Sequence, residues 1–122
     1  MEESEELKKT FLEEFDSARL LKDKGRMKSA VILLSKALFA LCDYIIIEKH
    51  KRLPKNHSER FRILEKKEPK IYSEVNRVWS GYTDTYSKPS DKESYALLRQ
   101  AINHISENER LDQEIKAIIE KQ

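Results

Sequence analysis

Apolar residues are concentrated in one stretch of the chain, residues 30–47, where 15 of 18 positions are apolar. Only Ser35, Lys36 and Asp43 interrupt it. A helix that is apolar around most of its circumference must be covered by neighbours on several sides. The pattern therefore predicts a central helix over residues 28–51. We expect Asp43 to be a half-buried polar anchor with a basic or hydroxyl partner.

The remaining apolar residues recur at helical spacing and predict amphipathic helices around the central one. The first helix is expected over residues 4–24, with an apolar face formed by Leu7, Phe11, Phe15 and Ala18. Gly25 follows a basic last turn, and a residue that tolerates left-handed geometry commonly ends a helix. Because almost no linker remains, we expect a tight antiparallel hairpin with the central helix.

Helix-start signals divide the second half of the chain into further helices. Asn56 with Glu59 three residues later resembles a capping box that starts a short helix. Pro69 suits the first turn of the helix that follows. Ser90 with Glu93 gives a second capping box, which starts the last long helix.

Apolar faces can be assigned to these later helices as well. The seam of the helix after Pro69 is expected to consist of Tyr72, Val75, Trp79, Tyr82 and Tyr86. The last core-facing stripe is expected to consist of Tyr95, Leu98, Ile102 and Ile105. The spacing then repeats at Leu111, Ile115 and Ile118. Either the last helix continues, or a small tail helix folds back or docks elsewhere; we favour continuation, with a fraying end over residues 110–122.

These elements predict an all-α fold in a single domain over residues 1–122. The expected architecture is an up-and-down bundle of four to five antiparallel helices. Two glycines and three prolines argue against an all-β fold, which needs many turns. A chain of 122 residues is long enough to bury one core without a metal or a disulfide.

Charge and cysteine content limit the setting in which the chain works. With 24 Lys+Arg and 22 Asp+Glu, the net charge of +2 provides no whole-molecule field for nucleic acid or a membrane. Cys42 cannot form a disulfide within the chain and is expected in the core. The acidic start is unlike a signal peptide, and Lys36 and Asp43 argue against a membrane span. We expect a soluble, cytoplasmic protein, and abundant Glu and Lys indicate a heat-loving source.

The sequence lacks the common motifs of enzymes and metal sites. It contains no His-Glu-x-x-His, no Cys-x-x-Cys and no Glu-x-x-His pair. Gly25 and Gly81 stand alone, so there is no phosphate-binding glycine loop. We therefore assign no catalytic residue, no metal ligand and no cofactor.

Positive charge is nevertheless concentrated in residues 48–70, which hold nine Lys/Arg and four Glu for a net +5. His50 and His57 lie in the same stretch. Such a stretch is either a solvated face or a surface that attracts RNA, nucleotide phosphate or an acidic protein. The aromatic seam is interpreted as core and dimer contact, because base stacking needs exposed rings beside basic groups.

Several segments together carry a family resemblance: Ser17-Ala18-x-x-Leu21-x-x-x-Gly25, the Ala/Leu-rich second helix, Pro54-Lys55-Asn56-His57-Ser58 and Tyr82-x-Asp84-x-Tyr86. Over residues 5–106 the chain resembles the HEPN family, the "higher eukaryotes and prokaryotes nucleotide-binding" domain. It is most similar to the small stand-alone archaeal and bacterial members. The resemblance implies a nucleotidyltransferase substrate-binding-like bundle, commonly a symmetric homodimer, often paired with a minimal nucleotidyltransferase.

The resemblance also raises the question of nuclease activity. Some HEPN proteins are RNA-cleaving toxins of toxin–antitoxin pairs, with an Arg-x4–6-His motif in which Arg stabilises phosphate charge and His handles a proton. In the matching region no His follows Arg77 within that window. The spacing occurs at Arg52 with His57, in an exposed loop away from the family position. It occurs again at Arg99 with His104, which point to different faces of one helix.

We therefore expect a non-catalytic or degenerate HEPN-type binding module that holds nucleotide or RNA phosphate. The candidate ligand-binding residues are Tyr82, Asp84, Tyr86, His57, Arg60 and Arg52. Asp84 is expected to accept a hydrogen bond from a ribose or a partner's Arg, and Arg60 to hold phosphate. The alternatives are a metal-independent RNase toxin and a purely structural dimeric adaptor.

Overall fold

The computed structural model describes the backbone of residues 2–83 and 90–121, and the side chains of residues 2–78 and 90–121. These residues are helical almost throughout and contain no strand. In chain order the helices are α1 (Glu2–Asp23), α2 (Met27–His50), α3 (His57–Lys67), α4 (Pro69–Thr83), α5 (Asp91–Asn108) and α6 (Gln113–Lys121). The prediction of an all-α bundle is thus confirmed for the part of the chain that the structure describes.

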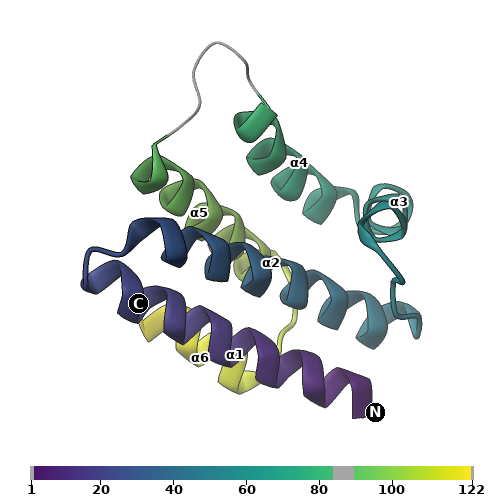
Figure 1. Cartoon of the computed structure of the whole chain (residues 1–122). Coiled ribbons are helices and arrows are strands. Elements are labelled where there is room, and N and C mark those ends of the chain that lie inside the picture. Colours follow the sequence, from purple (N-terminus) through teal and green to yellow (C-terminus); the bar gives the residue numbers. More distant parts are fainter. Residues whose placement is uncertain (1, 84–89, 122) are drawn as a thin grey trace.

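The first two helices form the expected hairpin, and the turn between them follows from Gly25. Gly25 has φ +77°, its N–H donates to Lys22 O, and the N–H of Arg26 donates to Leu21 O. This pair of hydrogen bonds is the usual helix end built on a left-handed glycine. The chain therefore reverses within a few residues, and α1 and α2 lie side by side in opposite directions (Figure 1).

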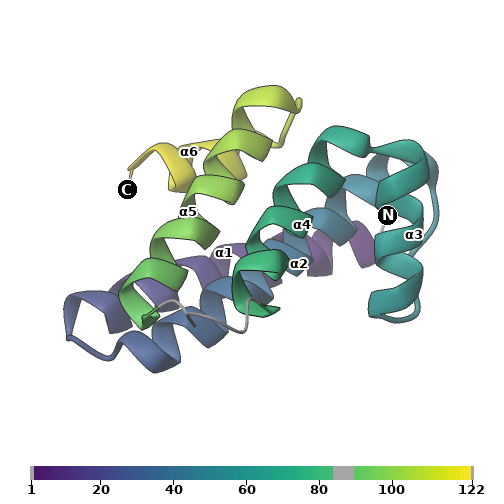
Figure 2. The same ribbon diagram turned by 90° about the horizontal axis from the view of Figure 1, so that it is seen from above.

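The α2 helix occupies the centre of the bundle. It packs against α1, α5 and α3, and α4 packs against α5 and α3 (Figures 1 and 2). Its buried residues are Ala30, Val31, Leu34, Ala37, Leu38 and all of residues 40–47. By length and composition α2 could span a membrane, but 72% of its most apolar window is buried within the molecule. That burial is expected of a core helix.

Asp43 has the basic partner expected from the sequence, and the partner is Arg60 on α3. Arg60 Nε donates to Asp43 Oδ1 at 2.6 Å, and Arg60 Nη2 donates to Asp43 Oδ2 at 2.8 Å. Both residues are buried, so Asp43 is covered more completely than the half-buried position expected from the sequence. Burial opposes the charge on Arg60, but the hydrogen bonds to Asp43 outweigh it, so the pKa of Arg60 is raised. This two-pronged ion pair joins α3 to the central helix.

The helix starts in the second half of the chain agree with the capping signals. Asn56 Oδ1 accepts from the N–H of Glu59 at the start of α3, and α4 begins at Pro69. At the start of α5, Ser90 and Glu93 form both hydrogen bonds of a capping box. The predicted core stripe of α5 is confirmed, since all four of its members are buried: Tyr95, Leu98, Ile102 and Ile105.

The expected seam of α4 is displaced. The buried positions are Ile71, Val75 and Val78, whereas Tyr72 is only half-buried. Both sets have helical spacing, and the sequence pattern cannot distinguish two adjacent apolar faces of one helix. The other expected members lie outside the described side chains: Trp79, Tyr82 and Tyr86.

The favoured continuation of the last helix is wrong, and the alternative of a separate tail helix is confirmed. α5 ends at Asn108 and α6 begins at Gln113, because Asp112 Oδ1 accepts from the N–H of Glu114 and starts a new helix. Lys8 on α1 forms ion pairs with Asp112 (3.2 Å) and Glu114 (2.8 Å). The turn allows α6 to pack against α1 and α5, where its buried residues are Ile115 and Ile119.

We predict that the Asp43–Arg60 pair is a major contributor to stability. Arg60→Met keeps the apolar stem but leaves Asp43 buried without a partner, so the free energy of unfolding should fall by about 3–5 kcal/mol. The control Arg62→Met, at an exposed arginine of the same helix, should change it by less than about 0.5 kcal/mol. Urea denaturation followed by circular dichroism measures both.

The double variant Asp43→Leu/Arg60→Met tests whether the loss in Arg60→Met comes from leaving Asp43 without a partner. Removing both charges leaves no buried unpaired group, so most of the loss in Arg60→Met should be recovered. A loss below about 1 kcal/mol in Arg60→Met would contradict the assigned role of the pair.

Candidate functional site

The structure describes the side chains of three of the six candidate ligand-binding residues. Arg52, His57 and Arg60 lie around the α2–α3 connection and the first turn of α3. Asp84 and Tyr86 lie outside the described residues, as does the side chain of Tyr82. Their assignment as ligand-binding residues stays a prediction.

Arg60, which is buried, and His57, which is exposed, contact each other. Arg60 Nη1 lies 2.5 Å from His57 Nδ1. Because a guanidinium can only donate, Nδ1 is the acceptor, and a neutral His57 carries its proton on Nε2. Both side chains also contact the ring of Phe39, Arg60 over its face and His57 edge-on. All the donors of Arg60 named so far serve Asp43 and His57, which favours a structural role over phosphate binding.

Arg52 has a separate partner. Its Nε donates to Glu59 Oε1 at 3.3 Å, on an exposed part of the connection to α3. Arg52 and His57 therefore have the spacing of a nuclease motif but interact with different groups. The ion pair of Arg52 is exposed, whereas that of Arg60 is buried. Of these two arginines, Arg52 can therefore exchange its carboxylate partner for an anion more easily.

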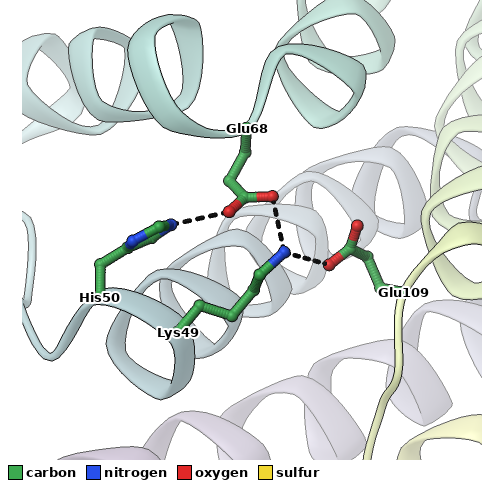
Figure 3. Close-up of polar contacts among 4 residues, drawn as sticks. All are labelled: Lys49, His50, Glu68 and Glu109. Carbon is green, nitrogen blue, oxygen red and sulfur yellow. Dashed lines mark hydrogen bonds and ion pairs between the residues drawn. The ribbon is translucent and has the colours of Figure 1, made fainter.

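A second network closes the end of the bundle and joins three segments (Figure 3). Glu68, between α3 and α4, accepts from His50 Nε2 at 2.7 Å and from Lys49 Nζ at 2.9 Å. Lys49 also donates to Glu109, just after α5, at 3.1 Å. Motif searching missed this cluster because its members come from distant parts of the chain. The charge run did contain Lys49, His50 and Glu68.

The state of Glu68 follows from its surroundings. Burial raises the pKa of this carboxyl group, but the hydrogen bonds from Lys49 and His50 outweigh burial, so its pKa is lowered. Glu68 is 7% exposed. At neutral pH it is therefore a buried carboxylate with both oxygens occupied, which is a structural arrangement rather than a reactive one.

The positive charge that remains available lies on α3 and near its two ends. Within the described part of the chain, six exposed cations of residues 48–70 make no ion pair. Lys51 donates to Glu48 O instead, and the other five follow it in the chain: Lys55, Arg62, Lys66, Lys67 and Lys70. Arg62 and Lys66 are one turn apart, so they share the solvent side of α3 opposite the buried Ile63 and Leu64. We call these five residues the α3 basic surface.

A polar cleft of about 340 Å³ lies between α4 and α5. Its lining includes Lys70, Ser73, Glu74, His104 and Asn108. His104 Nδ1 lies 3.1 Å from Glu74 Oε1, so Nδ1 donates to the carboxylate. In neutral His104 this leaves the Nε2 lone pair unused by that contact.

Arg99 faces the other side of α5, as the helical spacing predicted. It lies over the ring of Phe15 and donates to Ile119 O at 3.4 Å, away from the cleft with His104. Cys42 is fully buried, and burial together with Asp43 raises the pKa of its thiol to about 12. It is a core residue, as expected, and its thiol stays protonated.

Comparisons with known proteins add no further assignment. The chain matches no protein-family model, no curated protein and no solved structure. Within the described residues, no group of three His, Cys, Asp or Glu side chains is arranged to hold a metal ion. Any function must therefore be inferred from the geometry of the α3 basic surface and of the α4–α5 cleft.

We predict that Glu68 makes the protein sensitive to acid. Its folded pKa lies below the ordinary value of 4.5, so the unfolded chain takes up a proton at higher pH than the folded one. The stabilisation is complete above pH 4.5 and is lost as pH falls through the lowered pKa. Glu68→Gln should flatten the dependence of the melting temperature on pH in that acid range.

Glu65→Gln is the matched control, at an exposed carboxyl on α3. It should leave the acid dependence of the wild type unchanged. Asp112 also has a lowered pKa, because its hydrogen bonds from Glu114 and Lys8 outweigh burial, so some acid sensitivity persists in both variants. Identical pH profiles for Glu68→Gln and the wild type would contradict the prediction.

Proposed function

We propose that the chain is a non-catalytic, HEPN-type binding module that holds the phosphates of RNA or a nucleotide on the α3 basic surface. The observation that supports this most directly is the difference between used and unused charge in residues 48–70. Lys49, Arg52 and Arg60 are occupied by carboxylates within the molecule. The five cations of the α3 basic surface are exposed and make no such pair with any side chain that the structure describes.

This surface is suited to phosphate binding because its side chains are positively charged and because they are separate from one another along the chain. Lysine and arginine side chains on one helix face neutralise successive phosphates and release condensed counterions, without reading the sequence. The flexible stems of Lys66, Lys67 and Lys70 allow contacts to a backbone of varied shape. Several separate cations along a surface suit a polyanion better than a single small anion, because each can meet a different phosphate.

The family resemblance supplies the wider proposal. The all-helical bundle is compatible with the up-and-down, nucleotidyltransferase substrate-binding-like architecture that the resemblance implies. We infer a soluble, cytoplasmic homodimer whose protein partner is a minimal nucleotidyltransferase. A short nucleotidyltransferase reading frame beside the gene and co-purification of the two proteins are the observations that would support this pairing.

The α3 basic surface predicts a specific change in RNA affinity. A fluorescein-labelled single-stranded RNA should bind the wild type with an affinity that falls steeply with salt. Arg62→Glu/Lys66→Glu should weaken binding about tenfold at low salt and reduce the salt slope by about 1.4, because each lost contact to a single strand removes about 0.7. Fluorescence anisotropy measures both quantities.

A control with the same change in net charge, made elsewhere on the molecule, shows whether a loss of RNA affinity comes from contacts at α3 or from the net charge alone. Lys24→Glu/Lys28→Glu reverses two exposed lysines at the α1–α2 turn, far along the chain from α3. Its affinity for RNA should be close to that of the wild type. Equal losses in the two double variants would contradict the assignment to α3. A wild type that binds neither RNA nor ATP nor GTP would favour the structural adaptor.

One observation favours a second candidate, the metal-independent RNase. Glu74 orients His104 through Nδ1, so that Nε2 can take a proton from a hydroxyl group, and Lys70 lines the same cleft. The cleft thus contains a base and a cation that could stabilise phosphate charge.

RNA cleavage by the purified protein distinguishes the two candidates. The binding module leaves RNA intact. The RNase cleaves it in the presence of a chelator, loses that cleavage in His104→Ala, and keeps it in His57→Ala, because His57 lies outside this cleft. Cleavage lost in His57→Ala instead would contradict both assignments.

A further inference from the structure

An apolar groove of about 490 Å³ separates α2 from α4. α4 rests on α5 and α3 and stands away from the N-terminal half of α2 (Figure 1). The floor of the groove is core-like and consists of Val31, Leu38, Val75, Val78 and Leu98, each at most 6% exposed. Ile32 on the rim is 54% exposed. An open concavity with such a floor is typical of a ligand site.

The described polar side chains of the groove carry no negative charge. Its described lining includes Ser35, Lys36 and His57 and contains no carboxylate. Lys36 is exposed and makes no ion pair within the described part of the chain. Because Arg60 occupies His57 Nδ1, the N–H of a neutral His57 lies on Nε2 and is able to donate. The rim therefore offers one cation, one N–H donor and one hydroxyl group.

We propose that this groove binds a small amphiphilic acid, a molecule with an aliphatic or aromatic body and a single carboxylate. The body would replace water over the apolar floor, and the carboxylate would meet Lys36 at the rim. A neutral hydrophobic molecule would leave Lys36 unused, and a nucleotide would bring polar groups onto the floor. The volume lies within the range of about 300–1,000 Å³ typical of small-molecule sites. The proposal is independent of RNA binding, since the α3 basic surface does not line the groove.

Linear fatty acids are the probe, titrated into the full chain by isothermal calorimetry below their micelle concentrations. In the series octanoate, decanoate and dodecanoate, affinity should rise about fourfold per added methylene group. Dodecanol should bind more weakly than dodecanoate, because it lacks the charge. Affinity that is independent of chain length, or equal for the alcohol and the acid, would overturn the proposal.

Two variants place the probe in the groove. Ser35→Trp fills the cavity and should abolish dodecanoate binding while the circular dichroism spectrum stays helical. Lys36→Glu should weaken dodecanoate at least about tenfold and leave dodecanol unaffected. Lys28→Glu is the matched control on the same helix, exposed and outside the groove lining, and should behave as the wild type.

Other occupants of the groove give distinct results. If a second copy of the chain covers it, Ile32→Glu converts a dimer to a monomer in sedimentation, and fatty acids fail to bind the wild type. If an acidic protein segment is the occupant, the fatty acids fail to bind a monomeric wild type. Either result, or dodecanoate binding that persists in both Ser35→Trp and Lys36→Glu, overturns the proposal.

Discussion

The burial of α2 is the constraint on which the rest of the structure depends. This helix is apolar around most of its circumference, and such a helix is stable in water only when its neighbours cover it. α1 covers one side through a short hairpin, α5 covers another, and α3 covers the C-terminal half. On the side of α4 the N-terminal half of α2 is covered incompletely, since the groove lies between the two helices and Ile32 is exposed at its rim. The incomplete side of the core and the apolar groove are therefore the same feature.

The burial of α2 also explains the ion pair inside the bundle. Asp43 interrupts the apolar helix and, once α2 is covered, must have a partner at the point where α3 passes. Arg60 supplies two parallel hydrogen bonds and is itself held by His57 and Phe39. Releasing Arg60 to a phosphate would leave Asp43 buried and unpaired. The cations free to bind a ligand are those without an ion pair in the described part of the chain, and on α3 two of them, Arg62 and Lys66, lie on the side away from Arg60.

Much of the fold could be predicted from the hydrophobic periodicity and the capping signals of the sequence. The central helix, the hairpin at Gly25 and the capping box at Ser90 could be predicted because each depends on residues close together in the chain. The displaced seam of α4 could not, because two apolar faces were equally regular. The start of α6 depends on Asp112 and its ion pair with Lys8, residues 104 positions apart. The partner of Asp43 was predicted by type, but only the structure identifies Arg60.

The candidate site was less predictable than the fold for a related reason. A run of charge in the sequence does not say which charges meet a partner, and residues 48–70 contain both kinds. Lys49 reaches Glu109 and Arg60 reaches Asp43, whereas Arg62 and Lys66 reach solvent. α3 thus separates two surfaces of different chemistry. Its first residue, His57, lines the apolar groove, while its solvent side carries the basic surface. One short helix, held to the core by a buried ion pair, contributes residues to both surfaces, and the arginine that holds this helix in place belongs to neither.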